Sequence, residues 1–165
     1  MQNITVKRLP HNLDLPLPAF QTKGSAGMDL PAAVQVPVTI EPGERMMIPT
    51  GLAMAIPQGF VGLICSRSGL GAKNGVVVLI APGLIDSDYR GELLVTLFNS
   101  SKREPFTINR GDRIAQLMVT PVFQPEWREV DELTETERGA GGFGSTDKKG
   151  PDIAAGASSG TRKKV

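Results

Sequence analysis

Proline and glycine interrupt this chain so often that neither a long helix nor a long strand can form in most of it. The 165 residues include 13 prolines and 19 glycines. Proline removes a backbone N–H donor and fixes φ, whereas glycine favours turns, so together they divide a sequence into short segments. Several of the apolar segments between them are rich in Val, Ile and Phe, which favour strands. The sequence therefore predicts an all-β fold.

The predicted strands are short apolar runs bounded by turn residues, at 4–9, 45–48, 52–56, 60–65, 76–80, 92–99, 106–108, 114–122 and 127–130. Many short strands at this spacing are typical of an antiparallel sandwich, jelly roll or barrel. The one segment predicted to be helical is 68–73, directly after a strand.

Charge and rare residues exclude several classes of protein. Lys and Arg total 18 against 17 Asp and Glu, so we expect no direct nucleic-acid binding. The single cysteine, Cys65, excludes an intrachain disulfide and is predicted to be a packed thiol, and the single histidine, His11, is predicted to be an exposed loop residue. With no apolar run of membrane length and no signal segment, we expect a cytoplasmic protein and no membrane partner.

The apolar pattern ends near residue 134, which predicts three regions. Residues 1–133 are expected to form the β core. Residues 134–147 are charged and then glycine-rich, and we expect a mobile C-terminal arm. Residues 148–165 are small and basic, and we expect a disordered tail without chemistry.

The segment GLIDSDYRGE at 83–92 places two aspartates, a tyrosine, an arginine and a glutamate at a turn between two apolar runs. A rigid sheet can hold reactive groups at such a turn. Because Asp86 follows Leu84 and Ile85, its carboxylate is expected at the edge of a buried region. A partly buried carboxylate is a suitable general base.

Two further segments have the composition of phosphate-binding sites. Arg67, Ser68 and Gly69 stand at the start of the predicted helix, where free backbone N–H groups attract anions. The alternative is that Ser68 only caps the helix and Arg67 is a surface charge. In RGAGGFGST at 138–146, glycines allow close approach to an anion and an aromatic side chain can stack on a base, but a plain glycine linker is the alternative.

Four residues carry weaker signals. Asp29 lies in a glycine-containing turn, where turn capping is the simplest role of an aspartate. The adjacent Asp112 and Arg113 are predicted to form a structural ion pair. Gln116 interrupts an apolar strand and needs a hydrogen-bond partner if it is buried.

Taken together and in order, five segments resemble the trimeric dUTP diphosphatases (dUTPases). They are AGMDL at 26–30, SRSGLG at 66–71, GLIDSDYRGE at 83–92, NRGDRIAQL at 109–117 and RGAGGFGST at 138–146. The resemblance implies a jelly-roll-like distorted β-barrel, the dUTPase-like β-clip, that assembles as a homotrimer. It further implies three active sites at subunit interfaces, each built from all three chains and closed by the C-terminal arm of one of them.

The resemblance implies an enzyme that hydrolyses dUTP to dUMP and pyrophosphate by attack of water on the α-phosphorus, with Mg²⁺ as cofactor. Such an enzyme limits uracil incorporation into DNA and supplies dUMP for thymidylate synthesis. It also implies that the arm becomes ordered when ligand binds.

The resemblance implies one catalytic residue and one sugar contact: Asp86 would activate the attacking water, and Tyr89 would pack against the deoxyribose and exclude a 2′-hydroxyl. Backbone groups of a β-hairpin, including those of Leu79 and Gly83, would pair with the uracil edge. The implied phosphate-binding residues of the core are Arg67, Ser68, Gly69 and Gln116.

The remaining implied roles concern the arm and the metal. Phe143 would lie over the uracil beside Gly144, and the residues that would close on the β- and γ-phosphates are Arg138, Ser145 and Thr146. Asp29 would accept hydrogen bonds from waters on a Mg²⁺ held by the triphosphate.

Three positions depart from the family pattern: Ser66 replaces a common proline, Ile80 replaces an asparagine of some bacterial members, and Asp147 replaces a common glycine. We expect a looser loop at Ser66, no side-chain readout of uracil at Ile80, and an added anion near the phosphates at Asp147. Three rival interpretations remain: a dCTP deaminase-like enzyme of the same fold, a catalytically silent binding module, and a plain structural β-oligomer.

Overall fold

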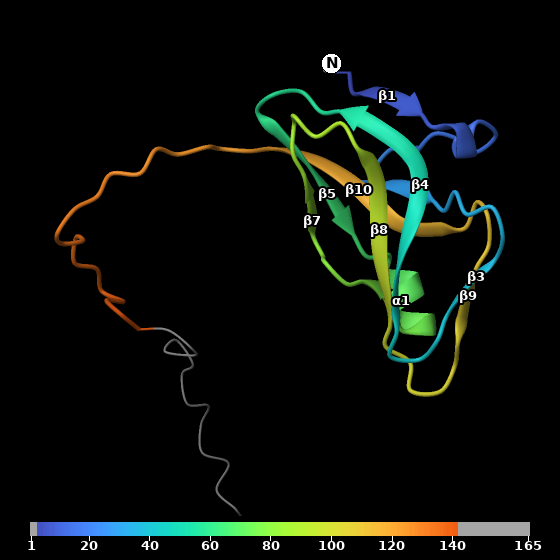
Figure 1. Cartoon of the computed structure of the whole chain (residues 1–165). Helices are drawn as coiled ribbons and strands as arrows, with labels where there is room; N and C mark the ends of the chain where they lie inside the picture. The colour runs from blue at the N-terminus through green and yellow to red at the C-terminus, as the bar shows by residue number, and fades with distance from the viewer. Residues whose placement is uncertain (1–2, 142–165) are drawn as a thin grey trace, which may run out of the picture. The chain divides into compact units, whose positions relative to one another are not determined.

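The computed structural model describes residues 3–141, and its regular structure is almost entirely β-strand (Figure 1). All of its strand pairs are antiparallel, which confirms the predicted all-β class. The helical segments are α1 (Ser68–Asn74), where the sequence predicts a helix, and the 3₁₀ turn η1 (Pro10–Asn12). No helix in the described part of the chain is long and apolar enough to cross a membrane.

The strands form two four-stranded sheets and one two-stranded ribbon. The first sheet has the order β1 (Thr5–Arg8), β4 (Arg45–Ala55), β8 (Glu92–Asn99), β6 (Val76–Val78). The second has the order β2 (Met28–Pro31), β10 (Arg113–Pro121), β5 (Phe60–Cys65), β7 (Gly83–Ile85). The ribbon pairs β3 (Val38–Ile40) with β9 (Phe106–Ile108).

One hydrophobic core joins all three sheets. Alternate residues of β8 point into it, as the burial of Leu93, Val95 and Leu97 shows, while the residues between them are more exposed. Leu30 of β2 and Leu117 of β10 meet the same cluster from the second sheet. Since burying a Leu or Val side chain is worth about 1.5–3 kcal/mol, this shared core holds the strand ends, and the turns between them, in place.

The structure joins two of the predicted strands. Segments 45–48 and 52–56 are parts of the single strand β4, whose register against β8 shifts between Pro49 and Ala53. Pro49 and Gly51 predict a break, but the shift accommodates them as an irregularity within one strand. Gly51 has a φ of 65°, which favours glycine.

The sequence missed β2, β3 and β7. All three are edge strands, where one side of the backbone needs no partner, so the proline and aspartate of β2 are tolerated there. The predicted strand at 127–130 is wrong: these residues are not assigned to any strand, because they have no pairing partner within residues 3–141.

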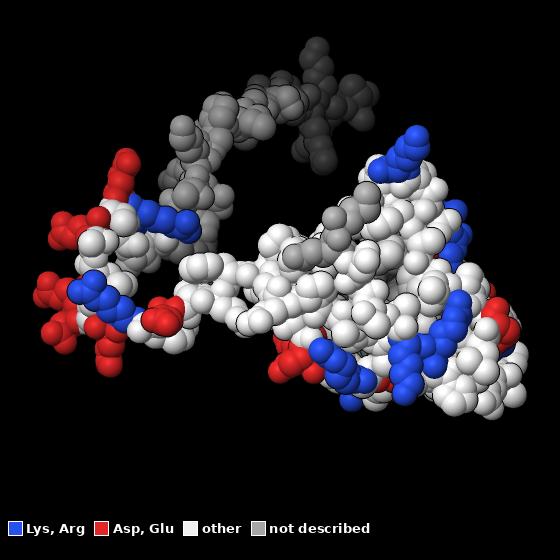
Figure 2. All heavy atoms as spheres, turned by 90° about the horizontal axis from the view of Figure 1, so that it is seen from above, with Lys and Arg blue, Asp and Glu red and all other residues white. Residues whose placement is uncertain are grey.

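Residues 126–141 belong to a second unit, separate from the compact unit that ends at Pro125. Its side chains are almost all exposed, with Trp127 98% and Leu133 88% accessible. Acidic side chains gather along it (Figure 2), namely Glu126, Glu129, Asp131, Glu132, Glu135 and Glu137.

Candidate active site

A cluster of two arginines, a glutamine and an aspartate lies around β10, which pairs with β2 on one side and with β5 on the other. Gln116 of β10 is opposite Asp29 on one side and Cys65 on the other. Arg67 follows Cys65 by two residues, at the start of α1. Strand pairing therefore brings together three of the residues assigned to phosphate or magnesium by resemblance.

Asp29 is the centre of this cluster. Its side chain is only 6% exposed, and its carboxylate lies 3.1 Å from Nε of Arg67 and 3.0 Å from Nη1 of Arg113. Gln116 donates to the same carboxylate through Nε2, over 3.4 Å. A buried carboxylate is stable only with such partners. Turn capping is therefore the wrong role for Asp29, which is a buried strand residue.

Arg113 pairs with Asp29, so the predicted Asp112–Arg113 ion pair is also wrong. The Asp112 carboxylate instead accepts the backbone N–H of Asn109 at 2.7 Å, which closes the turn before β10. The sequence spacing could not reveal this, because adjacent residues in an extended strand point to opposite faces.

Arg67 is held by two contacts, Nε to Asp29 and Nη1 to the carbonyl oxygen of Arg113 at 2.6 Å. It is the N-cap residue of α1, without a side-chain cap, and Ser68 is the first helical residue. Neither half of the alternative interpretation holds, since Arg67 is no free surface charge and Ser68 is no cap. Ser68 and Gly69 are exposed beside Arg67 and accessible to an anion.

Ser66 contradicts the expectation of a looser loop. Its Oγ accepts the backbone N–H of Val78 at 2.9 Å. The hydroxyl therefore ties the residues before α1 to β6, a contact that the common proline at this position could not make.

Asp86 and Tyr89 lie in the turn between β7 and β8. The backbone N–H of Tyr89 donates to the carbonyl oxygen of Asp86 at 3.2 Å, and the Tyr89 hydroxyl donates to the carbonyl oxygen of Glu92 at 2.9 Å. Asp86 is exposed in the single chain, which corrects the prediction of partial burial. The reason is that Leu84 beside it is itself 65% exposed on an edge strand.

Within one chain, the Asp86 turn and the Arg67 cluster lie at opposite ends of β5. Ile85 is opposite Gly62, so Asp86 lies near the start of β5, whereas Arg67 follows its end (Figure 1). At 3.3 Å per strand residue this separates the two groups by roughly 15–20 Å. One chain alone does not bring Asp86 to the cluster.

The segment 79–82 connects β6 to β7, which belong to different sheets, so the expected hairpin around Leu79 and Gly83 is a crossover between sheets. The backbone N–H of Leu79 donates a hydrogen bond to the carbonyl oxygen of Thr96 at 2.9 Å. Beside the segment lies a hollow of about 220 Å³ lined mainly by apolar residues, namely Ile64, Val78, Ile80, Gly83, Leu84, Ile85, Leu94, Val95 and Thr96.

Of the arm residues that were given a role at the site, Arg138 is the one that lies within the described residues. It closes a local turn in which its Nε donates to the carbonyl oxygen of Gly141 at 2.8 Å. Phe143, Gly144, Ser145 and Thr146 lie outside the described residues, as does Asp147.

Sequence reasoning missed Arg113 and Glu92, and it misplaced His11. His11 is half-buried in η1, with Nε2 2.8 Å from Oε1 of Glu92, so it is not an exposed loop residue. The contact joins segments 81 residues apart, and no local sequence pattern indicates such a pair. Cys65 is a free thiol of intermediate burial.

The described residues contain no group of three or more His, Cys, Asp or Glu side chains that could enclose a metal. The residues around Asp29 instead suit a metal ion that arrives bound to a substrate. A carboxylate offers about four acceptor positions, and Arg67, Arg113 and Gln116 occupy three on Asp29. One position remains for a metal-bound water, the mode that magnesium prefers.

The model of the dUTPase family matches residues 14–147. This chain belongs to the dUTPase family. The match includes all five of the segments on which the resemblance rested, and it covers the Asp29 cluster as well as the Asp86 turn.

Curated relatives agree over nearly the whole length. The chain is 57% identical over 145 residues to the deoxyuridine 5′-triphosphate nucleotidohydrolase of Methylocella silvestris, which covers 87% of this chain and 90% of that protein. It is 52% identical over 147 residues to the protein of the same name from a Wolbachia of Brugia malayi, which covers 88% and 94%.

Solved structures show the dUTPase fold. The dUTPase of Staphylococcus bacteriophage 80alpha with dUPNHPP superimposes with a TM-score of 0.79 at 32% identity, covering 90% of this chain and 100% of that chain. A mutant dUTPase from phage phi11 of S. aureus, described with a structural Mg(II) ion, gives a TM-score of 0.71 at 31% identity, covering 81% and 100%.

Proposed function

We propose that this dUTPase hydrolyses dUTP to dUMP and pyrophosphate by attack of water on the α-phosphorus. The observation that carries the proposal is the convergence of Arg67, Gln116 and Asp29 on one cluster beside the exposed Ser68 and Gly69. The relatives named deoxyuridine 5′-triphosphate nucleotidohydrolase support the same substrate.

The cluster is suited to a triphosphate because a polyanion repels an attacking nucleophile until its charge is neutralised. Asp29 holds Arg67 by Nε and leaves the guanidinium charged and ordered before substrate arrives. Such preorganisation lowers the reorganisation cost at the moment of reaction. Arg113 offsets the charge of Asp29, so the cluster as a whole stays cationic.

Asp86 is the general base. In the proposed reaction it orients the water and accepts its proton, and it also accepts a hydrogen bond from the 3′-hydroxyl. Tyr89, 42% exposed in the single chain, packs against the deoxyribose and leaves no space for a ribose 2′-hydroxyl. The hollow beside residues 79–84 supports the placement of a planar base there.

The active site is assembled from several chains of a homotrimer. The separation of the Asp86 turn from the Arg67 cluster within one chain supports this. The outer face of β4 and β8 supports it too, because it exposes Met47 and Leu94, 58% and 43% accessible, on neighbouring strands. Exposed apolar patches of this kind mark association surfaces.

The arm completes the site, with Arg138, Ser145 and Thr146 on the β- and γ-phosphates and Phe143 with Gly144 over the uracil. The glycines allow backbone amides to approach an anion. Magnesium, when bound with the triphosphate, supplies further charge neutralisation, and Asp29 is the residue that would hold it through water. The proposed reaction belongs to nucleotide metabolism, and we propose that the enzyme acts in the cytoplasm.

The decisive experiment measures hydrolysis of dUTP, dCTP, dTTP and UTP with and without Mg²⁺, and analyses the products. We expect dUMP and pyrophosphate from dUTP, strong rejection of dCTP through mismatched hydrogen bonds, and weaker activity without Mg²⁺. Ammonia release from dCTP would identify a deaminase instead, and binding without pyrophosphate release would identify a silent module.

A further inference from the structure

His11 and Glu92 form a contact that the proposed reaction does not use. Nε2 of His11 lies 2.8 Å from Oε1 of Glu92, and the two side chains are 25% and 21% exposed. Neither residue belongs to the phosphate cluster or to the segment beside the apolar hollow. Glu92 directly follows the turn that carries Asp86 and Tyr89, and it accepts a hydrogen bond from the Tyr89 hydroxyl.

Glu92 is fixed by more than the histidine. The same Oε1 accepts the backbone N–H of Gly51 at 2.7 Å. Its backbone is opposite Ala53 across the β4–β8 pair, next to the register shift of β4. The carboxylate therefore connects the first residue of β8 to the irregular part of β4 and, through His11, to the N-terminal turn.

The histidine itself stands on a firmly held turn. Leu9, just before η1, donates its N–H to the carbonyl oxygen of Gly51 at 2.8 Å. Asn12, at the end of η1, is completely buried and donates to the carbonyl oxygen of Thr50. Arg110 donates to the carbonyl oxygen of His11 at 2.8 Å. With its backbone held on both sides, His11 can act as a fixed support.

Glu92 in turn fixes Tyr89. The Tyr89 hydroxyl donates to the backbone carbonyl oxygen of Glu92 at 2.9 Å. The ring lies close against Gly91, since a Cβ built there would be only 2.4 Å from the Tyr89 hydroxyl oxygen. The orientation of the ring therefore depends on the backbone position of Glu92, which the carboxylate contacts determine.

We propose that His11 and Glu92 are positioning residues that set the orientation of Tyr89 and thereby the preference for deoxyribose over ribose. The inference rests on the proposed function, in which Tyr89 packs against the sugar. Loss of the His11 contact leaves the Glu92 carboxylate with Gly51 alone and loosens the start of β8. Tyr89 can then move from the place of the 2′-hydroxyl, and UTP is admitted.

The test compares kcat/KM for dUTP and UTP in the wild type and in His11→Ala, His11→Gln and Tyr89→Phe. We expect His11→Ala to reduce the dUTP-to-UTP ratio by about five- to tenfold, which lies within the coupling energies typical of contacting residues. His11→Gln should restore most of the ratio, because its amide N–H can replace Nε2–H as the donor to Glu92.

The path through Tyr89 is tested by a double-mutant cycle. Tyr89→Phe removes the hydroxyl that donates to the Glu92 carbonyl oxygen. Adding His11→Ala to Tyr89→Phe should therefore change the dUTP-to-UTP ratio no further. A fully additive effect in the double variant would overturn the proposal, and so would an unchanged ratio in a folded His11→Ala variant.

A second readout needs no catalysis. Tyr89 is the only tyrosine of the chain, so its ring resonances can be assigned directly in ¹H–¹³C NMR spectra. We expect these resonances to shift in His11→Ala and to return in His11→Gln. Unchanged resonances in His11→Ala would overturn the positioning role. If these shifts are observed but the wild type does not hydrolyse dUTP, only the proposed function is contradicted.

Discussion

Asp29 illustrates how one buried carboxylate can organise a cationic site. A charged group that is 6% exposed would be costly without partners, and the two arginines and Gln116 supply them. The same contacts hold Arg67 in place for an anion. The sequence shows an aspartate two residues after a glycine, but its arginine partners lie 38 and 84 positions later, and only the sheet brings them together.

Asp86→Asn tests the proposed base. The substitution keeps the shape of the side chain and removes its ability to accept the proton from water. We expect dUTP to bind with nearly unchanged affinity and kcat to fall by about 10²- to 10⁴-fold. Single-turnover kinetics with dUTP give both quantities, and turnover close to the wild-type value would refute the assignment.

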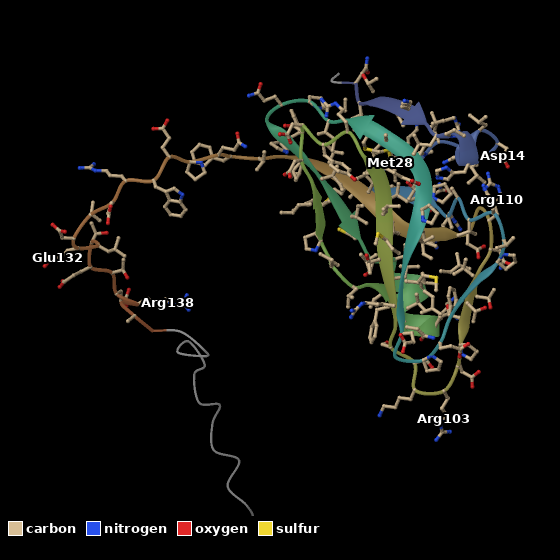
Figure 3. All side chains as sticks on the ribbon, viewed as in Figure 1. Asp14, Met28, Arg103, Arg110, Glu132 and Arg138 are labelled. Carbon is tan, nitrogen blue, oxygen red and sulfur yellow. The ribbon has the colours of Figure 1, made fainter. Side chains whose placement is uncertain are left out.

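Asp14 and Arg110 provide a pH prediction. Figure 3 shows the two side chains beside each other, and the hydrogen bond from Arg110 lowers the pKa of the Asp14 carboxyl. A lowered pKa in the folded state means that the pair stabilises the protein above the ordinary aspartate pKa, and that this contribution is lost as the pH falls through the lowered value.

In Arg110→Gln we therefore expect the Asp14 pKa, followed by ¹³C NMR, to rise toward its ordinary value. Asp14→Asn is the matched control for stability. It removes the titrating carboxyl while Arg110 keeps its bonds to the carbonyl oxygens of Val34 and His11, so the contribution of the pair to the pH dependence of stability should be absent. An Asp14 pKa that stays low in Arg110→Gln would show that another group is responsible.

At the scale of elements, the register shift in β4 is the feature on which the N-terminal turn depends. Gly51 has a φ of 65°, and a Cβ at this position would meet Cβ of Asn12 at 2.3 Å. Gly51 also accepts from Leu9 and donates to Glu92. The shift thus joins β4, η1 and the start of β8.

Gly51→Ala should destabilise the fold by about 2–4 kcal/mol, because backbone strain adds to a steric clash. Gly59→Ala is the control, since Gly59 has a φ of 83° but no atom within 4 Å of the place that an alanine methyl would take. This control should cost only about 1 kcal/mol, from backbone strain alone. Denaturant unfolding measures both, and equal losses would show that the Asn12 contact is unimportant.

The sequence predicted those elements whose signals are local. β5, β8 and β9 have the predicted boundaries, since each is an apolar run between turn residues. The sequence did not predict β2, because Asp29 and Pro31 disfavour a strand. It did not predict β7 because the three residues GLI are too few to form a recognisable strand pattern. Edge strands are defined by the partner that they find, not by their own composition.

The candidate site divides in the same way. Arg67 and Asp86 could be selected from their segments, and the resemblance gave them roles. Arg113, Glu92 and His11 could not. Arg113 and Glu92 do lie inside two of the five segments, but the importance of all three residues comes from contacts across the sheets, which the segments themselves do not reveal. The exposure of Asp86 was missed because a short apolar pair before an aspartate looks the same in sequence whether it lies in the core or on an edge strand.

At the scale of the whole molecule, the arm of one chain is expected to close an active site whose core residues come from the other chains. Deleting all residues after Glu137 removes Arg138 and the segment RGAGGFGST while leaving the core unchanged. We expect a folded trimer with severely reduced dUTP hydrolysis. Analytical ultracentrifugation and steady-state kinetics measure the two properties, and unchanged kinetics would mean that the arm takes no part.

The central claim is that Asp86 of one chain works with Arg67 of another. Two inactive variants, Asp86→Asn and Arg67→Ala, are therefore unfolded together, refolded as a one-to-one mixture, and assayed for dUTP hydrolysis. In randomly mixed trimers roughly a quarter of the sites combine an intact Asp86 with an intact Arg67 from different chains, so about a quarter of wild-type activity should return. If both residues of a site came from the same chain, every site would lack one of them and the mixture would remain inactive.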